Sequence, residues 1–168
     1  MTERKTRKPN EEGHRSKFLV IVDESPECEL VVYFTALRAR RTNSDLLMLF
    51  VVEPTDFQHW LKVEETHKQE GEQTAAAVFR LYQIKLNSWG LDSVPTHEVV
   101  RHGSKLEEIV SLINEDEDIS FLVLGASTSA EGPGWLVSQL AGKQSAEFPV
   151  PIVIIPGSLE LHEIEALT

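Results

Sequence analysis

Five short, mostly apolar runs recur along the chain. They are Phe18–Val22, Leu46–Val52, Thr96–Arg101, Ile119–Gly125 and Val150–Ile155. Four are close to continuously apolar, which is typical of strands buried on both faces of a parallel sheet. The third carries more polar residues, as an edge strand can. Pro151 and Pro156 in and after the last run lack a backbone N–H, so we expect that strand at an edge or at an interface between subunits.

Helix signals fill the intervals between these runs. Ser25 is placed to cap a first helix, with Pro26 at its first position. Ser104–Glu107 matches a capping box that opens a later helix. That helix has an apolar stripe at helical spacing, formed by Leu106, Ile109, Val110 and Ile113.

Residues 55–74 are polar apart from a small apolar island. The island consists of Phe57, Trp60 and Leu61. We interpret the segment as a loop and the opening of a long helix that continues over Ala75–Trp89 and stops at Gly90. The island either packs this connection against the core, or forms a surface that binds a partner, or forms a lid over the site.

Residues 119–157 are the strongest candidate for a chemical site. A strand runs into the small-residue loop Gly125–Gly134, a helix is expected over Trp135–Glu147, and the last strand follows. The start of that helix would aim free N–H groups into the space above the sheet, where an anion can bind.

Strands and helices therefore alternate along the whole chain. This order predicts an α/β fold, a three-layer α/β/α sandwich in which right-handed crossovers build a five-stranded parallel sheet. Such sheets bind ligands beyond the carboxyl ends of their strands. The residues expected at those ends include Asp23, Val51, Gly103 and Gly125.

Length and charge limit the interpretation further. The 168 residues fit one domain, and a net charge of -11 argues against nucleic acid as a partner. The first 17 residues are the exception, because six basic and three acidic side chains give +3 and leave -14 for the remainder. We expect residues 1–16 to be a disordered basic arm, with contact to an acidic patch or to RNA as the alternative, and residues 158–168 to be a frayed tail.

The chain shows no secretory signal and no apolar run long enough to span a membrane. Its single cysteine, Cys28, excludes an intrachain disulfide. We therefore expect a soluble cytoplasmic protein without a membrane partner.

Several catalytic signatures are missing from the sequence. It contains no phosphate-binding P-loop, no G-x-G-x-x-G after the first strand and no G-x-S-x-G. The six histidines show no metal-ligand pairing, so we expect no metal. A phospho-receiver would find paired acids at Asp23 and Glu24, but Gly103 and Gly157 stand near its other required positions.

The remaining polar positions suit a nucleotide. Asp23 can accept a hydrogen bond from a ribose hydroxyl or an adenine amine, and Val51 with Leu124 offers apolar walls. The loop that contains Gly132 and Gly134 can bring its backbone close to phosphates. The structural alternatives are that Asp23 assists Ser25 as a cap and that the two glycines only frame Pro133 in a turn.

In five segments taken in order, the chain resembles the universal stress protein superfamily. The segments are Phe18–Asp23 with Ser25, Leu46–Glu53, His102–Ser104, Leu122–Gly125 and Pro151–Pro156. They lie within residues 17–157, which we take as the family's domain. The resemblance implies an adenine-nucleotide alpha-hydrolase-like fold with strand order 3-2-1-4-5. A homodimer through Val150–Ile155 is a further hypothesis, because this apolar edge strand would otherwise be exposed.

The resemblance also implies which residues form the nucleotide site. Asp23, Val51, Leu124 and Gly125 correspond to the adenine and ribose side. The family's phosphate motif begins at a glycine that corresponds to Gly125. Its next glycine corresponds to Thr128, and its final Gly-Ser/Thr pair to Ser138 and Gln139. One of three glycines is retained, and Gly132 and Gly134 offer a substitute cradle.

Three functions follow from this resemblance. The first is a homodimeric, non-catalytic stress-response protein that acts by binding protein partners and has an altered or lost nucleotide site. The second is an ATP-binding regulator with slow hydrolysis. The third is a nucleotidyl-transferring enzyme of the same architecture, which the absence of His-x-Gly-His and Ser-Gly-Gly-x-Asp-Ser signatures disfavours.

Overall fold

The structure is a computed structural model that describes residues 4–54 and 61–168, with only the backbone of residues 61–64. The apolar island predicted at Phe57 and Trp60 lies outside the described residues. Among the described helices, none is both long and apolar enough to cross a bilayer.

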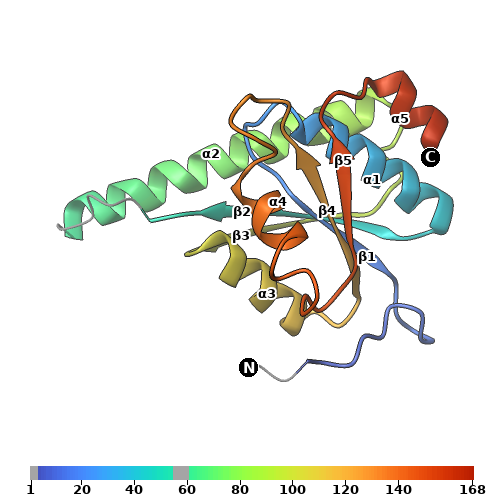
Figure 1. Cartoon of the computed structure of the whole chain (residues 1–168), viewed down its shortest axis with the longest axis horizontal. Coiled ribbons are helices and arrows are strands. Elements are labelled where there is room, and N and C mark those ends of the chain that lie inside the picture. The colour runs from blue at the N-terminus through green and yellow to red at the C-terminus, as the bar shows by residue number, and fades with distance from the viewer. Residues whose placement is uncertain (1–3, 55–60) are drawn as a thin grey trace.

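Five parallel strands form one sheet in the order β3-β2-β1-β4-β5 (Figure 1), as the sequence predicts. The strands are β1 Lys17–Ile21, β2 Asp45–Val52, β3 Thr96–His102, β4 Ile119–Ala126 and β5 Ile152–Pro156. The more polar third strand and the proline-flanked last strand occupy the two edges. Both edge predictions are confirmed.

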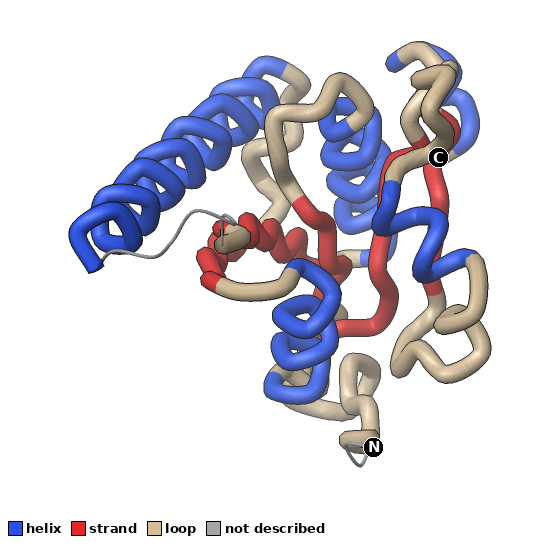
Figure 2. Tube along the Cα trace, turned by 60° about the vertical axis from the view of Figure 1, so that its left-hand side comes forward, coloured by secondary structure: helices blue, strands red, loops and turns tan. Residues whose placement is uncertain are grey.

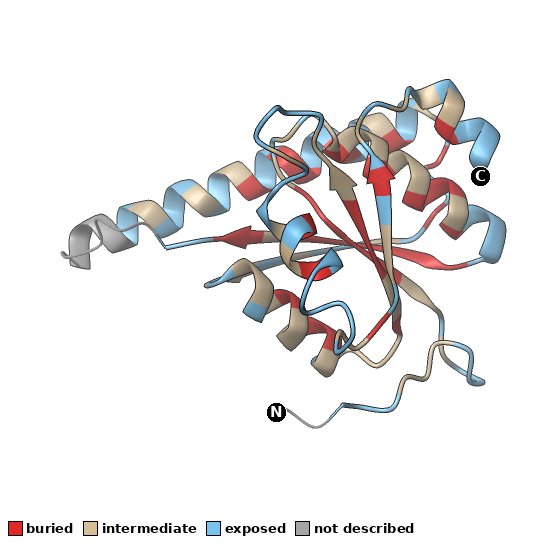
Figure 3. Cartoon of the chain, in the orientation of Figure 1, coloured by how far each residue is buried: buried red, intermediate tan, exposed pale blue. Residues whose placement is uncertain are grey.

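Helices cover the sheet on both faces (Figures 1 and 2). They are α1 Cys28–Thr42, α2 Leu61–Ser88, α3 Lys105–Glu115, α4 Trp135–Ala141 and α5 Leu161–Leu167. Side chains of β1 alternate between two cores. Phe18 and Val20 pack with α1 and α2, whereas Leu19 and Ile21 pack with α3 and α4. Figure 3 shows the buried residues concentrated along these contacts.

Helix α2 begins at Leu61, within residues 55–74 where the opening of a long helix was predicted, and ends at Ser88. It passes directly over the end of β2. A Cβ at Gly71 would lie 2.4 Å from a methyl group of Val52, so glycine lets the helix approach this strand. The helix ends as expected, before Gly90 with φ 71.

Two carboxyl-terminal segments differ from the prediction. Helix α4 ends at Ala141 rather than Glu147, and residues 142–147 form turns that begin at Gly142. The frayed tail expected at 158–168 contains α5, which packs on α1 and buries Ile164. Burial of this apolar side chain supplies the tertiary contact that a short helix needs.

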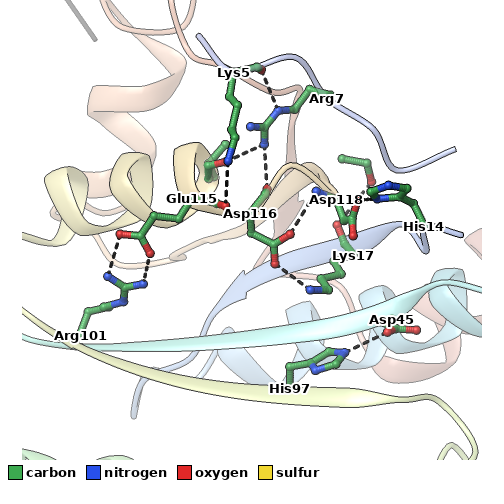
Figure 4. Close-up of polar contacts among 12 residues, drawn as sticks. Lys5, Arg7, His14, Lys17, Asp45, His97, Arg101, Glu115, Asp116 and Asp118 are labelled. Atoms are coloured by element: carbon green, nitrogen blue, oxygen red, sulfur yellow. Dashed lines mark hydrogen bonds and ion pairs between the residues drawn. The ribbon is translucent and has the colours of Figure 1, made fainter. Parts of the chain in front are cut away.

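Residues 4–16 pack against the end of α3 and the turn before β4 (Figure 4). Arg7 Nη1 donates to the carbonyl oxygens of Ile113 at 2.7 Å and Asp116 at 3.0 Å. The N–H of Lys8 donates to the carbonyl oxygen of Glu117 at 2.8 Å. This placement differs from the expected disordered arm, because these donors satisfy carbonyl groups at the negative end of a helix.

Asp45, the first residue of β2, is the centre of an ionic cluster beside this arm. Its Oδ1 accepts from Arg15 Nε at 2.8 Å, and its Oδ2 lies 2.9 Å from His97 Nε2 (Figure 4). Burial raises the pKa of Asp45, but the hydrogen bonds with His97 and Arg15 outweigh burial and hold this pKa below its ordinary value.

Because its folded-state pKa is lowered, the ionised Asp45 stabilises the fold above the ordinary carboxyl pKa, and this contribution disappears as pH falls through the folded-state value. We predict that Asp45→Asn lowers the free energy of unfolding at pH 7 by about 1–3 kcal/mol. The difference from wild type should shrink below about pH 4. Urea unfolding at stepped pH measures both effects.

Asp92→Asn is the matched control, because Asp92 is exposed in the turn after α2. A difference between Asp45→Asn and wild type that stays constant from about pH 7 to pH 3 would contradict the prediction.

Candidate functional site

A cavity of about 440 Å³ lies at the carboxyl ends of β1, β2 and β4. Its polar and charged lining comes from the segments that follow these strands and from the first residues of α1 and α3. Those residues are Asp23, Ser25, Glu27, Glu53 and Lys105. Its walls are largely apolar and include Ile21, Val31, Leu124, Leu136 and Val137. This position is where parallel α/β sheets bind ligands.

Asp23 is held by the turn that follows β1. Its Oδ1 accepts hydrogen bonds from the N–H of Ser25 at 2.8 Å and from the Ser25 hydroxyl. Ser25 does not cap α1 as predicted, because the helix begins at Cys28 with Glu27 as its N-cap residue. The turn therefore fixes the carboxylate at the cavity and leaves it able to accept from a ligand.

Gly125 lets β4 approach the first turn of α1 closely. A Cβ at this position would lie 2.8 Å from Glu27 Cγ and 2.9 Å from a Val31 methyl group. The side chain of Glu27 thus occupies the space beside the glycine, on the cavity side of the sheet.

The loop between β4 and α4 makes its own hydrogen bonds. The N–H of Ser127 donates to the carbonyl oxygen of Pro133 at 3.0 Å, and that of Gly132 to the carbonyl oxygen of Ser129 at 3.0 Å. The N–H groups of Ser129 and Glu131 donate to serine hydroxyls of the loop at 3.1 and 3.2 Å. Four backbone donors of the loop are thus already bonded within it.

The start of α3 also holds a group from the chain itself. Ser104 is the N-cap residue, but its side chain makes no capping hydrogen bond, unlike the predicted capping box. A carboxylate oxygen of Glu53 instead accepts from the N–H of Lys105 at 3.3 Å. An anion supplied by β2 thus lies at this positive helix end.

Cys28 forms part of the cavity floor and is buried. Burial raises the pKa of its thiol to about 11, despite a hydrogen bond with Tyr82. The thiol is therefore protonated at neutral pH, and it lacks the thiolate that a cysteine nucleophile requires.

The cavity brings together only some of the predicted site residues. Asp23, Leu124, Gly125 and Gly134 line it. The other predicted residues lie outside its described lining. Val51 is buried in the core shared with α3 and α4. Thr128 and Gly132 lie in the loop after β4, and Ser138 and Gln139 lie on α4.

The lining residues that sequence reasoning missed include three charged side chains and one aromatic side chain. They are Glu27, Glu53, Lys105 and Trp135. Glu53 directly follows a strand and Lys105 opens a helix, so their positions at the carboxyl edge were a usable signal. Glu27 and Trp135 gave no comparable signal, because their approach to the cavity depends on how α1 and α4 pack.

Strand order, parallel pairing and a cavity at the carboxyl edge define an adenine-nucleotide alpha-hydrolase-like fold. The model of the universal stress protein family matches residues 14–156, and the chain belongs to this family.

Solved structures support the fold. The universal stress protein UspA from Lactobacillus plantarum is 17% identical, with a TM-score of 0.68 over 83% of this chain and 97% of that one. A universal stress protein in complex with cAMP is 16% identical, with a TM-score of 0.56 over 84% and 95%. The protein from Archaeoglobus fulgidus in complex with dAMP is 16% identical, with a TM-score of 0.55 over 83% and 97%. The comparison with curated proteins gives no match.

We predict that Gly125→Ala lowers the free energy of unfolding by about 1–3 kcal/mol, because the new methyl group overlaps Glu27 and Val31. Val31 is branched at Cβ, so its side chain has few rotamers with which to move away from the new methyl group. Removing its methyl groups should relieve the part of the overlap that involves Val31, so Val31→Ala should cost less in the Gly125→Ala background than in wild type. Chemical denaturation of the four proteins in this cycle measures the coupling, and strictly additive effects would argue against the close approach.

Proposed function

We propose that this chain is a non-catalytic, regulatory universal stress protein that acts as a homodimer and has a weakened adenine-nucleotide site. In this proposal it works in the cytoplasm by binding a protein partner. The observation that carries the weakened site is the loop after β4, whose N–H groups at Ser127, Ser129, Glu131 and Gly132 are bonded internally.

The residues expected to contact the base and the ribose support the proposal that the protein still binds adenine compounds weakly. Asp23 and Leu124 line the cavity together with Gly125. Relatives of the same fold were crystallised with cAMP and dAMP. The phosphate side supports weakening. Thr128 and Ser138 stand where the family motif has glycines, Gln139 stands where it has Ser or Thr, and all three lie outside the cavity lining.

A second candidate function is ATP binding with slow hydrolysis. Lys105 lines the cavity and can approach a phosphate group as a cation. The third candidate, nucleotidyl transfer, has less support, because the sequence contains neither a His-x-Gly-His nor a Ser-Gly-Gly-x-Asp-Ser signature.

We predict that Mg-ATP does not saturate the protein at micromolar concentration in isothermal titration calorimetry. Any residual binding should fall further in Asp23→Ala and remain unchanged in Asp92→Ala, which removes an exposed carboxylate elsewhere. Saturation at micromolar Mg-ATP that Asp23→Ala abolishes would favour the second candidate and contradict the weakened site.

The homodimer is proposed to form through the free edge of β5. This strand pairs with β4 on one side, and its Ile154 is 37% exposed. An apolar edge strand is a template for pairing with a second copy of the chain.

We predict a dimer in light scattering at micromolar protein concentration and a monomer for Ile154→Lys, because a charge on the edge opposes pairing. Val100→Lys is the matched control, since Val100 lies on the opposite edge strand and is also 37% exposed. A wild-type monomer at high micromolar concentration, or equal loss of the dimer in both variants, would contradict this interface.

A further inference from the structure

Carboxylates dominate the charge of the cavity. Asp23 and Glu27 reach it from the segment between β1 and α1, and Glu53 from the residue after β2. Lys105 is the one cation among the described lining residues. These four side chains sum to a charge of -2 at neutral pH, within a protein of net charge -11. Such a lining repels phosphate groups and attracts hydrogen-bond donors and cations.

Two positions that could attract phosphate already hold groups of the chain. Glu53 accepts from the N–H of Lys105 at the start of α3, and four N–H groups of the loop over residues 127–132 are bonded within the loop. A phosphate tail would have to displace these contacts and approach Glu27 beside Gly125. The electrostatic cost grows with each phosphate group.

The remainder of the cavity suits an uncharged aromatic ring. Trp135 lines its mouth and is 56% exposed, and the walls at Leu124 and Val137 are apolar. An exposed indole can stack on a heterocyclic base. The amine and hydroxyl groups of a nucleoside would meet carboxylate acceptors at Asp23 and Glu27.

We propose that this cavity binds a purine nucleoside that carries no phosphate and that its carboxylates discriminate against the phosphorylated forms. Trp135 provides the stacking surface, Asp23 accepts from the base or the ribose, and Glu27 and Glu53 face the 5′ side. The inference rests on the proposed function, because it places the ligand in the site that the family fold provides.

The test is calorimetry on the full chain with four ligands that differ only at the 5′ position: 5′-amino-5′-deoxyadenosine, adenosine, AMP and Mg-ATP. Affinity should fall from the ammonium to the hydroxyl compound and again to the two phosphorylated ligands, AMP and Mg-ATP. Adenosine should bind about tenfold or more tightly than AMP, a difference that a single unfavourable charge contact can produce. Raising the salt concentration should narrow the gap.

The double variant Glu27→Gln/Glu53→Gln removes two charges but keeps the amide oxygens as acceptors. It should reduce the preference for adenosine over AMP and the preference for the 5′-ammonium analogue. Glu12→Gln/Glu70→Gln makes the same change in net charge at exposed positions outside the cavity and should leave both preferences unchanged. Trp135→Ala should lower the affinity for all four ligands by a similar factor, because each carries the same base.

Absence of adenosine binding up to millimolar concentration would overturn the inference and leave the weakened nucleotide site standing. AMP or Mg-ATP binding as tightly as adenosine would also overturn it. Micromolar saturation by Mg-ATP would contradict the proposed function as well, so the two failures are distinguishable. Equal effects of the two double variants would show that the discrimination does not arise in the cavity.

Discussion

Burial of the central strand on both faces is the constraint from which the rest of the structure follows. Successive side chains of β1 pack into two separate cores, so both faces of the sheet must be shielded from solvent. Helices must therefore cover both sides, and each crossover must return the chain to the same end of the sheet. The strands consequently finish together, which brings Asp23, Glu53 and Gly125 to one cavity.

Occupancy by the chain's own groups distinguishes this cavity from a generic phosphate site. The carboxylate of Glu53, just after β2, lies at the start of α3, and the side chain of Glu27, just before α1, fills the space beside Gly125. Both residues are immediately adjacent to an element in the sequence: Glu53 follows the last residue of β2, and Glu27 precedes the first residue of α1. The fold thus determines where a ligand would sit, whereas a few boundary residues determine its charge.

The five strands of the sheet could be predicted from the sequence, because a strand that is buried on both faces must consist mainly of apolar residues. Strand order and both edges were predictable from the resemblance and from the prolines around β5. Helix ends were harder, since the contact of Gly71 with Val52 and the packing of Ile164 on α1 are tertiary and leave no periodic signal. The charge of the cavity was missed for the same reason, because Glu27 lies beside Gly125 only after α1 docks on β4.

The location of the amino-terminal arm has a practical consequence. Arg7 and Lys8 bind the turn before β4, at the amino ends of the strands, whereas the cavity lies at their carboxyl ends. A surface tether or affinity tag joined to the start of the chain would thus orient the cavity toward the bulk solution. Immobilised protein could then be screened against metabolite mixtures with its binding face unobstructed.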